Sequence, residues 1–273
     1  MPADGGFPRR RYRQLPAPGT QPRVKPAPFE YHAPTSVDEA VRLLGMLEDA
    51  KVLAGGQSLV PLLNFRLARP AHVVDINGIP ALDRIYERDG GVAVQALVRQ
   101  SDAQRSELLQ KLCPLVPEAL KHVAHQVIRN RGTVVGSIAH ADPAAELPAV
   151  ILALQGSVRA LGPGGTRDIP AESFFMGVLE SALAPDELAV EVWFPAFTGP
   201  HGLREESRRH GDYAMAGVVR AGDRLALFGV APTPVTADPN EPTRDLQPSA
   251  DLEATPGFRK HLITAMTREL FAA

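Results

Sequence analysis

The segment from 52 to 59 reads Val52-Leu53-Ala54-Gly55-Gly56-Gln57-Ser58-Leu59, a short apolar strand that runs directly into a pair of glycines. Adjacent glycines permit backbone conformations with positive φ and leave no Cβ between the main chain and a ligand. Successive backbone N–H groups can then converge on an anion such as a pyrophosphate, and the Gln57 and Ser58 side chains add donors. A plain tight turn would also explain the glycine pair. The segment is neither G-x-G-x-x-G nor a P-loop, which needs a lysine after its second glycine.

A second polar stretch runs from Arg129 to Pro143. Its side chains at Thr133, Ser137, His140 and Asp142 can each hydrogen-bond a ligand, and Gly136 again allows close approach. Pro143 favours an extended backbone at Asp142, which limits where that carboxylate can point. A carboxylate there can accept a hydrogen bond from a ribose hydroxyl or from a ring N–H of a ligand. An ordinary turn and helix cap, with Pro143 in a first helical turn, would explain the same residues.

Around these segments, helix and strand patterns are mixed. Two capping boxes, 36–39 and 101–104, predict helices; the first should end near Asp49, and the second should carry Leu108, Leu109 and Leu112. Strand patterns cover 52–54, 72–76, 91–96, 188–194 and 224–230, and a terminal helix carries Leu262, Ile263, Met266 and Leu270 on one face. Because no regular βαβ repeat is present, the predicted fold class is α+β.

Three segments in this order resemble the motifs of one known family. The segment 54–59 resembles A-G-G-x-S-L, and 133–137 resembles T-x-G-G-[NS] followed by A-x-x-D-P. Residues Arg209-His210-Gly211-Asp212-Tyr213-Ala214 resemble R-x-G-D-[YF]-A. The family is the medium, FAD-binding subunit of the carbon monoxide dehydrogenase and xanthine dehydrogenase group of molybdenum hydroxylases. The match runs from about Lys25 to Val235.

The resemblance implies a two-subdomain FAD-binding fold of the vanillyl-alcohol oxidase type over 25–200. A small, shortened C-terminal α+β domain over 201–273 would follow, with the Pro-rich segment 232–256 as a long loop. Both polar loops would hold the pyrophosphate of a non-covalent FAD, Asp142 would lie nearer the ribityl or flavin end, and Tyr213 would lie on the isoalloxazine face. The cofactor-binding residues expected on this basis are Leu53, Ala54, Gly55, Gly56, Gln57, Ser58, Leu59, Thr133, Val134, Gly136, Ser137, His140, Asp142, Leu188 and Tyr213.

The resemblance also implies partners. These are a molybdopterin-binding large subunit and a small subunit with [2Fe–2S] clusters, assembled as a dimer of heterotrimers. Electrons would pass from the clusters to this FAD and on to an external acceptor, with no catalytic residue in this chain. Two alternatives stay open: a free-standing flavin oxidase with its own substrate pocket, and an assembly module that has lost FAD.

Two positions depart from the family pattern. Val135 stands where the family usually has the first glycine of its pair, and a β-branched residue is poor at positive φ, so weaker binding is expected there. This departure motivates the assembly-module alternative. Glu205 stands where some relatives carry a basic residue, which puts a cationic contact at that position in doubt.

Length and composition limit the number of domains and the classes of function that the chain can have. The 273 residues suffice for about two domains, and a net charge of −2 gives no reason to expect nucleic acid or an acidic membrane surface. The single cysteine, Cys113, excludes an intrachain disulfide and cannot by itself ligate an iron–sulfur cluster; we expect it to be buried and inert. No apolar run approaches the ~20 residues of a membrane span, so the cytoplasm is the default location.

Two further stretches carry little specific signal. Residues 1–24 are rich in arginine and proline and predict a disordered basic tail. His122 and His125 are expected on one helix face, but no carboxylate or thiol cluster joins them, so they predict no metal site.

Overall fold

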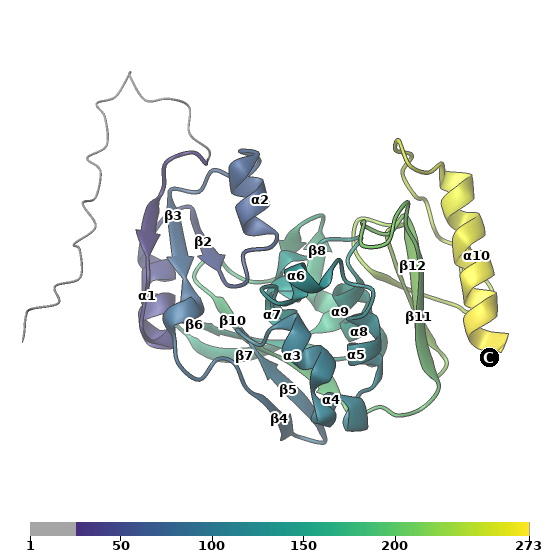
Figure 1. Cartoon of the computed structure of the whole chain (residues 1–273), viewed down its shortest axis with the longest axis horizontal. Helices are drawn as coiled ribbons and strands as arrows, with labels where there is room; N and C mark the ends of the chain where they lie inside the picture. The colour runs from purple at the N-terminus through teal and green to yellow at the C-terminus, as the bar shows by residue number, and fades with distance from the viewer. Residues whose placement is uncertain (1–25, 273) are drawn as a thin grey trace, which may run out of the picture.

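The computed structural model describes residues 26–272, and Figure 1 shows their arrangement. The predicted tail at 1–24 lies outside the described residues. The strands are β1 (Glu30–His32), β2 (Ala50–Leu53), β3 (His72–Asp75), β4 (Ile85–Arg88), β5 (Gly91–Gln95), β6 (Ser157–Gly162), β7 (Gly165–Pro170), β8 (Phe175–Gly177), β9 (Glu180–Ser181), β10 (Leu188–Pro195), β11 (His201–Glu206), β12 (Ala216–Ala221), β13 (Arg224–Phe228) and β14 (Val235–Ala237). The helices are α1 (Val37–Met46), α2 (Leu59–Asn64), α3 (Gln100–Arg105), α4 (Glu107–Leu112), α5 (Leu115–Ala119), α6 (Gln126–Arg129), α7 (Val134–His140), α8 (Glu146–Leu154), α9 (Ala171–Phe174) and α10 (Pro256–Ala272), with a 3₁₀ turn η1 (Ile76–Gly78).

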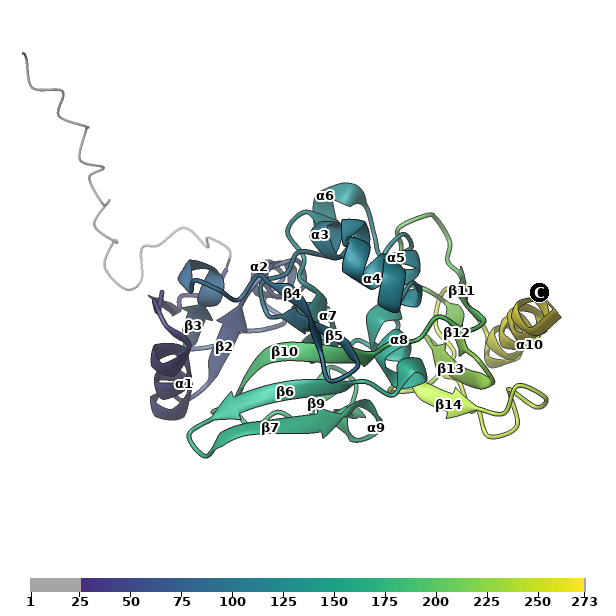
Figure 2. The same ribbon diagram turned by 90° about the horizontal axis from the view of Figure 1, so that it is seen from below.

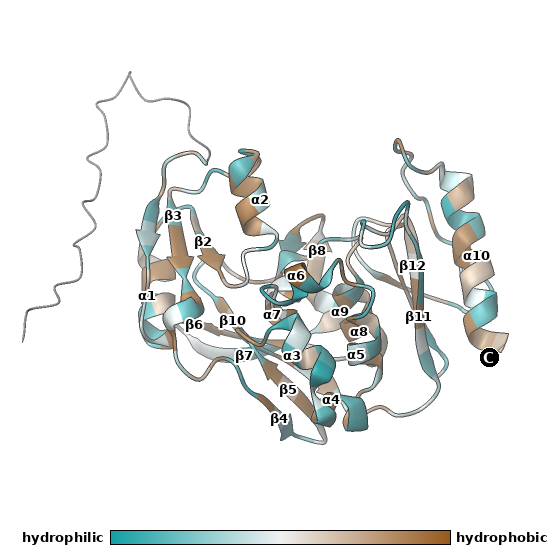
Figure 3. Ribbon diagram, in the orientation of Figure 1, coloured by the Kyte–Doolittle hydropathy of each residue, from teal (hydrophilic) through white to brown (hydrophobic). Residues whose placement is uncertain are grey.

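The N-terminal sheet is parallel, with strand order β1-β3-β2. The helices α1 and α2 connect its strands, so the segment 30–75 is a βαβαβ unit. The sequence pattern predicted no βαβ repeat, and this unit corrects that prediction locally. Because the strands are parallel, the carboxyl ends of β2 and β3 meet at one edge, and the glycine pair follows β2 there. Figure 3 shows hydrophobic residues along β2 and β3; Val74 of β3 is buried in a cluster with residues of α1, and Val52 of β2 packs against that cluster.

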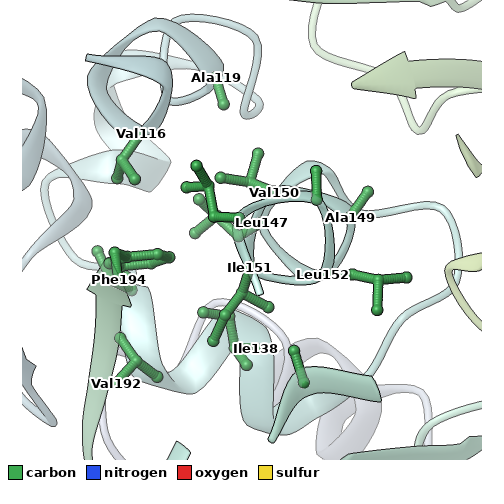
Figure 4. Close-up of a cluster of buried hydrophobic side chains, with 14 of the residues drawn as sticks. Val116, Ala119, Ile138, Leu147, Ala149, Val150, Ile151, Leu152, Val192 and Phe194 are labelled. Carbon is green, nitrogen blue, oxygen red and sulfur yellow. The ribbon is translucent and has the colours of Figure 1, made fainter. Parts of the chain in front are cut away.

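The central sheet has five strands in the order β4-β5-β10-β6-β7, all paired antiparallel. One face of this sheet, the helices α3 to α5 and the helices α7 to α9 together form the main hydrophobic core. The helix α8 lies at the centre of that core, and all nine of its residues are buried. Figure 4 shows its Leu147 and Ile151 side chains among residues of α5, α7 and β10.

The C-terminal sheet is an antiparallel meander, β11-β12-β13-β14. Alternate residues face opposite sides: Val219 and Phe228 join the main core beside α8, whereas Val218 and Leu227 pack against α10. Figures 1 and 2 show this sheet between α8 and α10. The predicted loop at 232–256 contains β14 but otherwise forms neither helix nor strand before α10 begins.

The predicted helix starts are partly right. Ser36 caps α1 by accepting from the Glu39 N–H at 3.2 Å, but the Glu39 carboxylate accepts from the Thr35 N–H at 2.8 Å instead of reaching back to Ser36. The helix ends at Met46, three residues before the predicted Asp49. The second box is wrong: Ser101 lies inside α3, and Ser106 caps α4, which carries the expected leucines. Arg99 forms a β-bridge with Thr133, and the Gln100 N–H donates to the Gly132 carbonyl. These contacts fix the chain just before the helix, so α3 begins at Gln100 and not after Ser101.

The structure also tests the predictions for Cys113 and for the histidine pair. Cys113 is fully buried at the end of α4, so the prediction of a buried thiol is confirmed, and burial raises the pKa of this thiol to about 12, which disfavours the reactive thiolate. His122 and His125 do not share a helix: His122 follows α5 in a turn, and His125 precedes α6 as its N-cap. In the described range, no helix is long and apolar enough to span a membrane.

Candidate functional site

The glycine loop packs directly on the second polar segment. A Cβ added to Gly55 would lie 2.4 Å from the Arg131 carbonyl oxygen, 2.8 Å from the Gly132 Cα and 3.0 Å from the Thr133 nitrogen. These are all backbone atoms, so a side chain at Gly55 would have to separate the two main chains. Gly56 has a different reason to be glycine, because its φ is +74°. The structure therefore brings together two segments that lie more than 70 residues apart in the sequence.

The glycine loop presents unused hydrogen-bond donors. Among the described residues, no acceptor is found for the backbone N–H groups of Gly55, Gly56, Gln57 and Ser58. The Gln57 side chain donates to the Gly55 carbonyl at 3.3 Å, and the Ser58 side chain does not cap α2. A turn lined by several free N–H groups is the backbone arrangement that binds anions.

The segment 133–137 is the start of α7 and not a loop. The Thr133 hydroxyl accepts from the Gly136 N–H at 3.1 Å, and a Cβ on Gly136 would lie 2.5 Å from that hydroxyl oxygen. Val135 is a buried helical residue and is not among those with positive φ. The expectation that valine strains the backbone here is therefore wrong. The Val134 side chain is also buried, and its N–H donates to the Val98 carbonyl at 3.2 Å.

Two side chains that sequence reasoning missed tie the loops together. Arg99 donates to the Arg131 carbonyl at 2.8 Å and to the Asn77 side chain at 2.7 Å. Asn77 in turn donates to the Ala54 carbonyl at 2.7 Å. Both residues thus fix the carbonyl groups beside the glycine contact. Asn77 follows β3 at the same sheet edge as the glycine loop, but only the parallel pairing reveals this.

The Arg99 guanidinium carries a positive charge at the contact between the two loops. The pKa of the Arg99 guanidinium is lowered, first by burial and then by the neighbouring Arg131 guanidinium, while Asp102 and Asp75 act in the opposite direction. Two cations held close together repel each other, and an anion bound between the loops would relieve that repulsion.

The opposite end of α7 carries the remaining polar residues. Ala141 ends the helix at φ +54°, and the Asp142 carboxylate accepts from the Ala144 N–H at 2.9 Å. Tyr213 is 63% exposed overall, although desolvation, followed by the carboxylates of Asp142 and Glu146, raises the pKa of its hydroxyl. The ring is thus open to a ligand while its hydroxyl lies near the Asp142 carboxylate. Burial lowers the pKa of His140, and Asp142 opposes this shift.

The loop that carries Tyr213 rests on a histidine. Gly211 has φ +89°, and a Cβ there would lie 2.5 Å from the His125 ring. Beside Tyr213, a hollow of about 330 Å³ is lined by Pro143, Val178 and residues of the loop after β13, of the loop before α10 and of α10 itself. Another hollow of about 460 Å³, between α1 and the turn after β6, lies away from both loops and includes none of the expected cofactor-binding residues.

Of the three expected leucines, Leu188 is buried, whereas Leu53 and Leu59 are half-buried. Leu188 is only 2% exposed and belongs to the apolar cluster against which Ala54 packs. Leu53 is half-buried in β2, directly before the loop. The structure therefore places the Leu188 side chain beneath the site, in the cluster that supports the glycine loop.

Residues 27–197 match the family model described as the FAD binding domain in molybdopterin dehydrogenase. The chain belongs to this family. It is 47% identical over 199 residues to the alpha subunit of the 6-hydroxypseudooxynicotine dehydrogenase complex of Paenarthrobacter nicotinovorans, covering 71% of this chain and 67% of that protein. It is 43% identical over 220 residues to the carbon monoxide dehydrogenase medium chain of Hydrogenophaga pseudoflava, covering 76% and 77%.

Solved structures agree with this assignment. A structure of the Hydrogenophaga pseudoflava carbon monoxide dehydrogenase, in a form that lacks the Mo-pyranopterin moiety, superposes with a TM-score of 0.86 at 36% identity and covers 92% of this chain and 98% of that chain. Quinoline 2-oxidoreductase from Pseudomonas putida 86 gives a TM-score of 0.85 at 31% identity, covering 91% and 97%. The predicted relationship to the FAD-binding medium subunits is thus confirmed.

The residues of this FAD-binding subunit suit the phosphate part of its cofactor. Free N–H groups line the glycine turn, and the Arg99 guanidinium donates to the Arg131 carbonyl, against which Gly55 packs. The free donors and the positive charge favour a bound pyrophosphate over a plain turn, which needs neither, while the Gly55 contact fixes how the two segments pack.

Proposed function

We propose that this subunit passes electrons from [2Fe–2S] clusters on a partner subunit, through FAD, to an external acceptor. The observation that carries the proposal is the arrangement of polar residues at the two ends of α7. The anion-binding turn lies at the first end, and Asp142 with the exposed Tyr213 ring lies at the second. A helix of seven residues rises about 10 Å, so the two ends are separated by roughly the distance that a ribityl chain must bridge.

Each end of α7 has its own role in this proposal. The N–H groups of residues 55–58 would hold the pyrophosphate, with Arg99 keeping the two loops in register. Asp142 would accept a hydrogen bond from the ribityl or flavin part, and the Tyr213 ring would lie against the flavin. The other expected residues would support the site between these ends; they are Leu53, Ala54, Leu59, Thr133, Val134, Gly136, Ser137, His140 and Leu188, of which Val134 and Leu188 are buried and act through packing.

FAD, when bound, supplies a carrier that accepts and releases electrons one at a time or in pairs. The protein's part is to bind that carrier and to position it near a partner. The relatives named above belong to multi-subunit dehydrogenase complexes. By analogy, the proposed partners are a molybdopterin-binding large subunit and a [2Fe–2S] small subunit, joined as a dimer of heterotrimers, with a cytoplasmic location. A vanillyl-alcohol oxidase type of fold over 25–200, and a separate domain over 201–273, belong to the same proposal.

The alternatives lose support on particular observations. The prediction of a module without FAD depended on Val135, and the helical position of that residue removes its motive. A free-standing oxidase would require its own substrate site. The proposal instead assigns the hollow lined by Tyr213 to the external acceptor.

The proposed electron path predicts no turnover by this subunit alone. With FAD bound, the purified chain should leave organic substrates of the holoenzyme unoxidised and its flavin absorbance unchanged. Addition of the reduced [2Fe–2S] subunit should bleach the flavin band in a stopped-flow measurement. Substrate oxidation by the isolated chain at the rate of the complex would contradict the proposal, and so would a flavin that the reduced partner fails to bleach.

Replacing Tyr213 by alanine should weaken FAD binding about threefold to tenfold, because a stacked ring contributes roughly 0.5–1.5 kcal/mol beyond the area it buries. The variant should also show altered flavin fluorescence and oxygen reactivity, since its flavin becomes more exposed. Tyr213→Phe keeps the ring and should retain nearly full affinity. Unchanged fluorescence and dissociation constant in Tyr213→Ala would show that the ring does not contact the flavin.

A further inference from the structure

Three metal-ligating side chains converge on the first sheet, away from the FAD site. The strands β1 and β3 pair in parallel, with Glu30 opposite His72 and His32 opposite Val74. Glu30 and His32 are two residues apart on one strand, so they share a face, and His72 joins them from the neighbouring strand. Tyr31 points the other way and donates to Asp75 at 2.5 Å, on the side of the Asn77–Arg99 tie. The cluster is therefore separate from the network that holds the glycine loop.

The ligand atoms are spaced as a metal site requires. His32 Nε2 lies 3.1 Å from His72 Nδ1, and His72 Nδ1 lies 3.5 Å from Glu30 Oε2. One ligand atom from each residue falls within 4.8 Å of both others. Tetrahedral Zn²⁺ with bonds of about 2.0–2.1 Å holds its ligand atoms about 3.3 Å apart. Small rotations of the three side chains would thus bring their lone pairs onto one ion.

The chemistry of the cluster also suits a cation. Two imidazole nitrogens at 3.1 Å can share one proton, so at least one of them offers a lone pair. The Glu30 carboxylate adds a negative charge on the same side. Since a divalent ion binds the same lone pairs that the shared proton uses, it can replace that proton.

We propose that Glu30, His32 and His72 bind a divalent transition-metal ion of the Zn²⁺ class. Two imidazoles and one carboxylate favour Zn²⁺ or Co²⁺ over Mg²⁺ or Ca²⁺, which prefer oxygen ligands. The His72 side chain is 19% exposed and Glu30 is 75% exposed, so the ion would lie at the surface with water completing its coordination. The proposal is independent of electron transfer, because neither polar loop contributes a ligand.

A titration with Co²⁺ and Zn²⁺ tests the site. The full chain is purified with its FAD and without a polyhistidine tag, freed of metal with a chelator, and titrated with Co²⁺ while visible absorbance is followed. We expect one equivalent of Co²⁺ to bind and Zn²⁺ to displace it. Even residues that only support metal ligands contribute about 10- to 100-fold in affinity, so His32→Gln and His72→Gln should each weaken binding at least tenfold.

The control is His261→Gln, which removes an exposed histidine on α10 and should leave the titration unchanged. The proposal is overturned if the parent chain shows no saturable Co²⁺ binding, or if His32→Gln and His72→Gln bind as the parent does. Should either variant fail to fold by circular dichroism, the parent chain decides the matter: Zn²⁺ must protect both His32 and His72 from diethylpyrocarbonate, read by peptide mass spectrometry. Equal modification with and without Zn²⁺ would reject the site.

Discussion

Gly55→Val is expected to abolish FAD retention while leaving the rest of the chain folded. Its new side chain must displace the backbone of Arg131, Gly132 and Thr133, because a Cβ alone would already lie 2.4–3.0 Å from their atoms. Moving that segment separates the donors of the glycine turn from the start of α7. We expect the dissociation constant for FAD to rise at least about a hundredfold, or about 2.8 kcal/mol.

The measurement is the flavin-to-protein ratio by absorbance, together with FAD binding by calorimetry and the far-ultraviolet circular dichroism of the variant. Gly164→Ala is the matched control, because a Cβ there meets no atom within 4 Å and should change nothing. Gly56→Ala should have an intermediate effect, since its added Cβ meets only side chains but its φ is positive. A folded Gly55→Val chain with full flavin content would reject the assignment of this loop to the cofactor.

Glu146→Gln is expected to make the protein more stable above neutral pH. Glu146 is 9% exposed at the start of α8, and burial, assisted by the nearby Glu205, raises the pKa of its carboxyl to about 8. The Glu205 carboxylate has few partners of its own. Its Oε1 lies 3.5 Å from His122 Nδ1, and its Oε2 is buried without a hydrogen-bond partner in the described part of the chain. The position that departs from the family pattern therefore forms an acidic pair with Glu146.

The sign of the effect follows from where the proton is held. The folded state keeps a proton on Glu146 that the unfolded state has already lost above pH 4.5, so folding stability falls as pH rises from about 4.5 to about 8. Each pH unit in that window costs about 1.4 kcal/mol for one group, which gives roughly 3–4 kcal/mol between pH 5 and pH 8. The glutamine side chain does not ionise in this range, so the free energy of unfolding of the variant should change less with pH.

Urea unfolding at a series of pH values measures this difference. Glu107→Gln is the control, since Glu107 is an exposed residue at the equivalent first position of α4. Its profile should follow that of the parent chain. Parallel profiles for the parent and Glu146→Gln would show that Glu146 is ionised in the folded protein.

Local patterns in the sequence predicted the elements well, because burial and turn chemistry act over a few residues. The predicted strands at 72–76, 91–96 and 188–194 agree with β3, β5 and β10 within one or two residues. The terminal helix buries Ile263, Met266 and Leu270, as its spacing required. Ser36 was a true cap, whereas Ser101 was not, since pairing of the preceding residues with 132 and 133 decided where α3 began.

The assembly of the site was beyond such patterns. The contact between Gly55 and the segment 131–133, and the tie through Asn77 and Arg99, depend on pairings between distant strands. Val135 shows the same limit, because a motif position that suggested a strained loop is in fact the first turn of a helix. Family resemblance supplied the pairing of the two loops, and the structure supplies the physical reason for it.

The burial of α8 has a consequence for how the chain is made. This helix is apolar after its first residue, Glu146, and it packs on β12 and β13 as well as on the central core. A nascent chain that ends at residue 200 therefore exposes one side of this hydrophobic helix to solvent. Exposed hydrophobic surface of this kind binds chaperones and promotes aggregation. Completion of the meander at 216–228 covers it. In a fragment truncated at the domain boundary predicted near residue 200, the side of α8 that the meander covers would remain exposed, and we expect the fragment to aggregate.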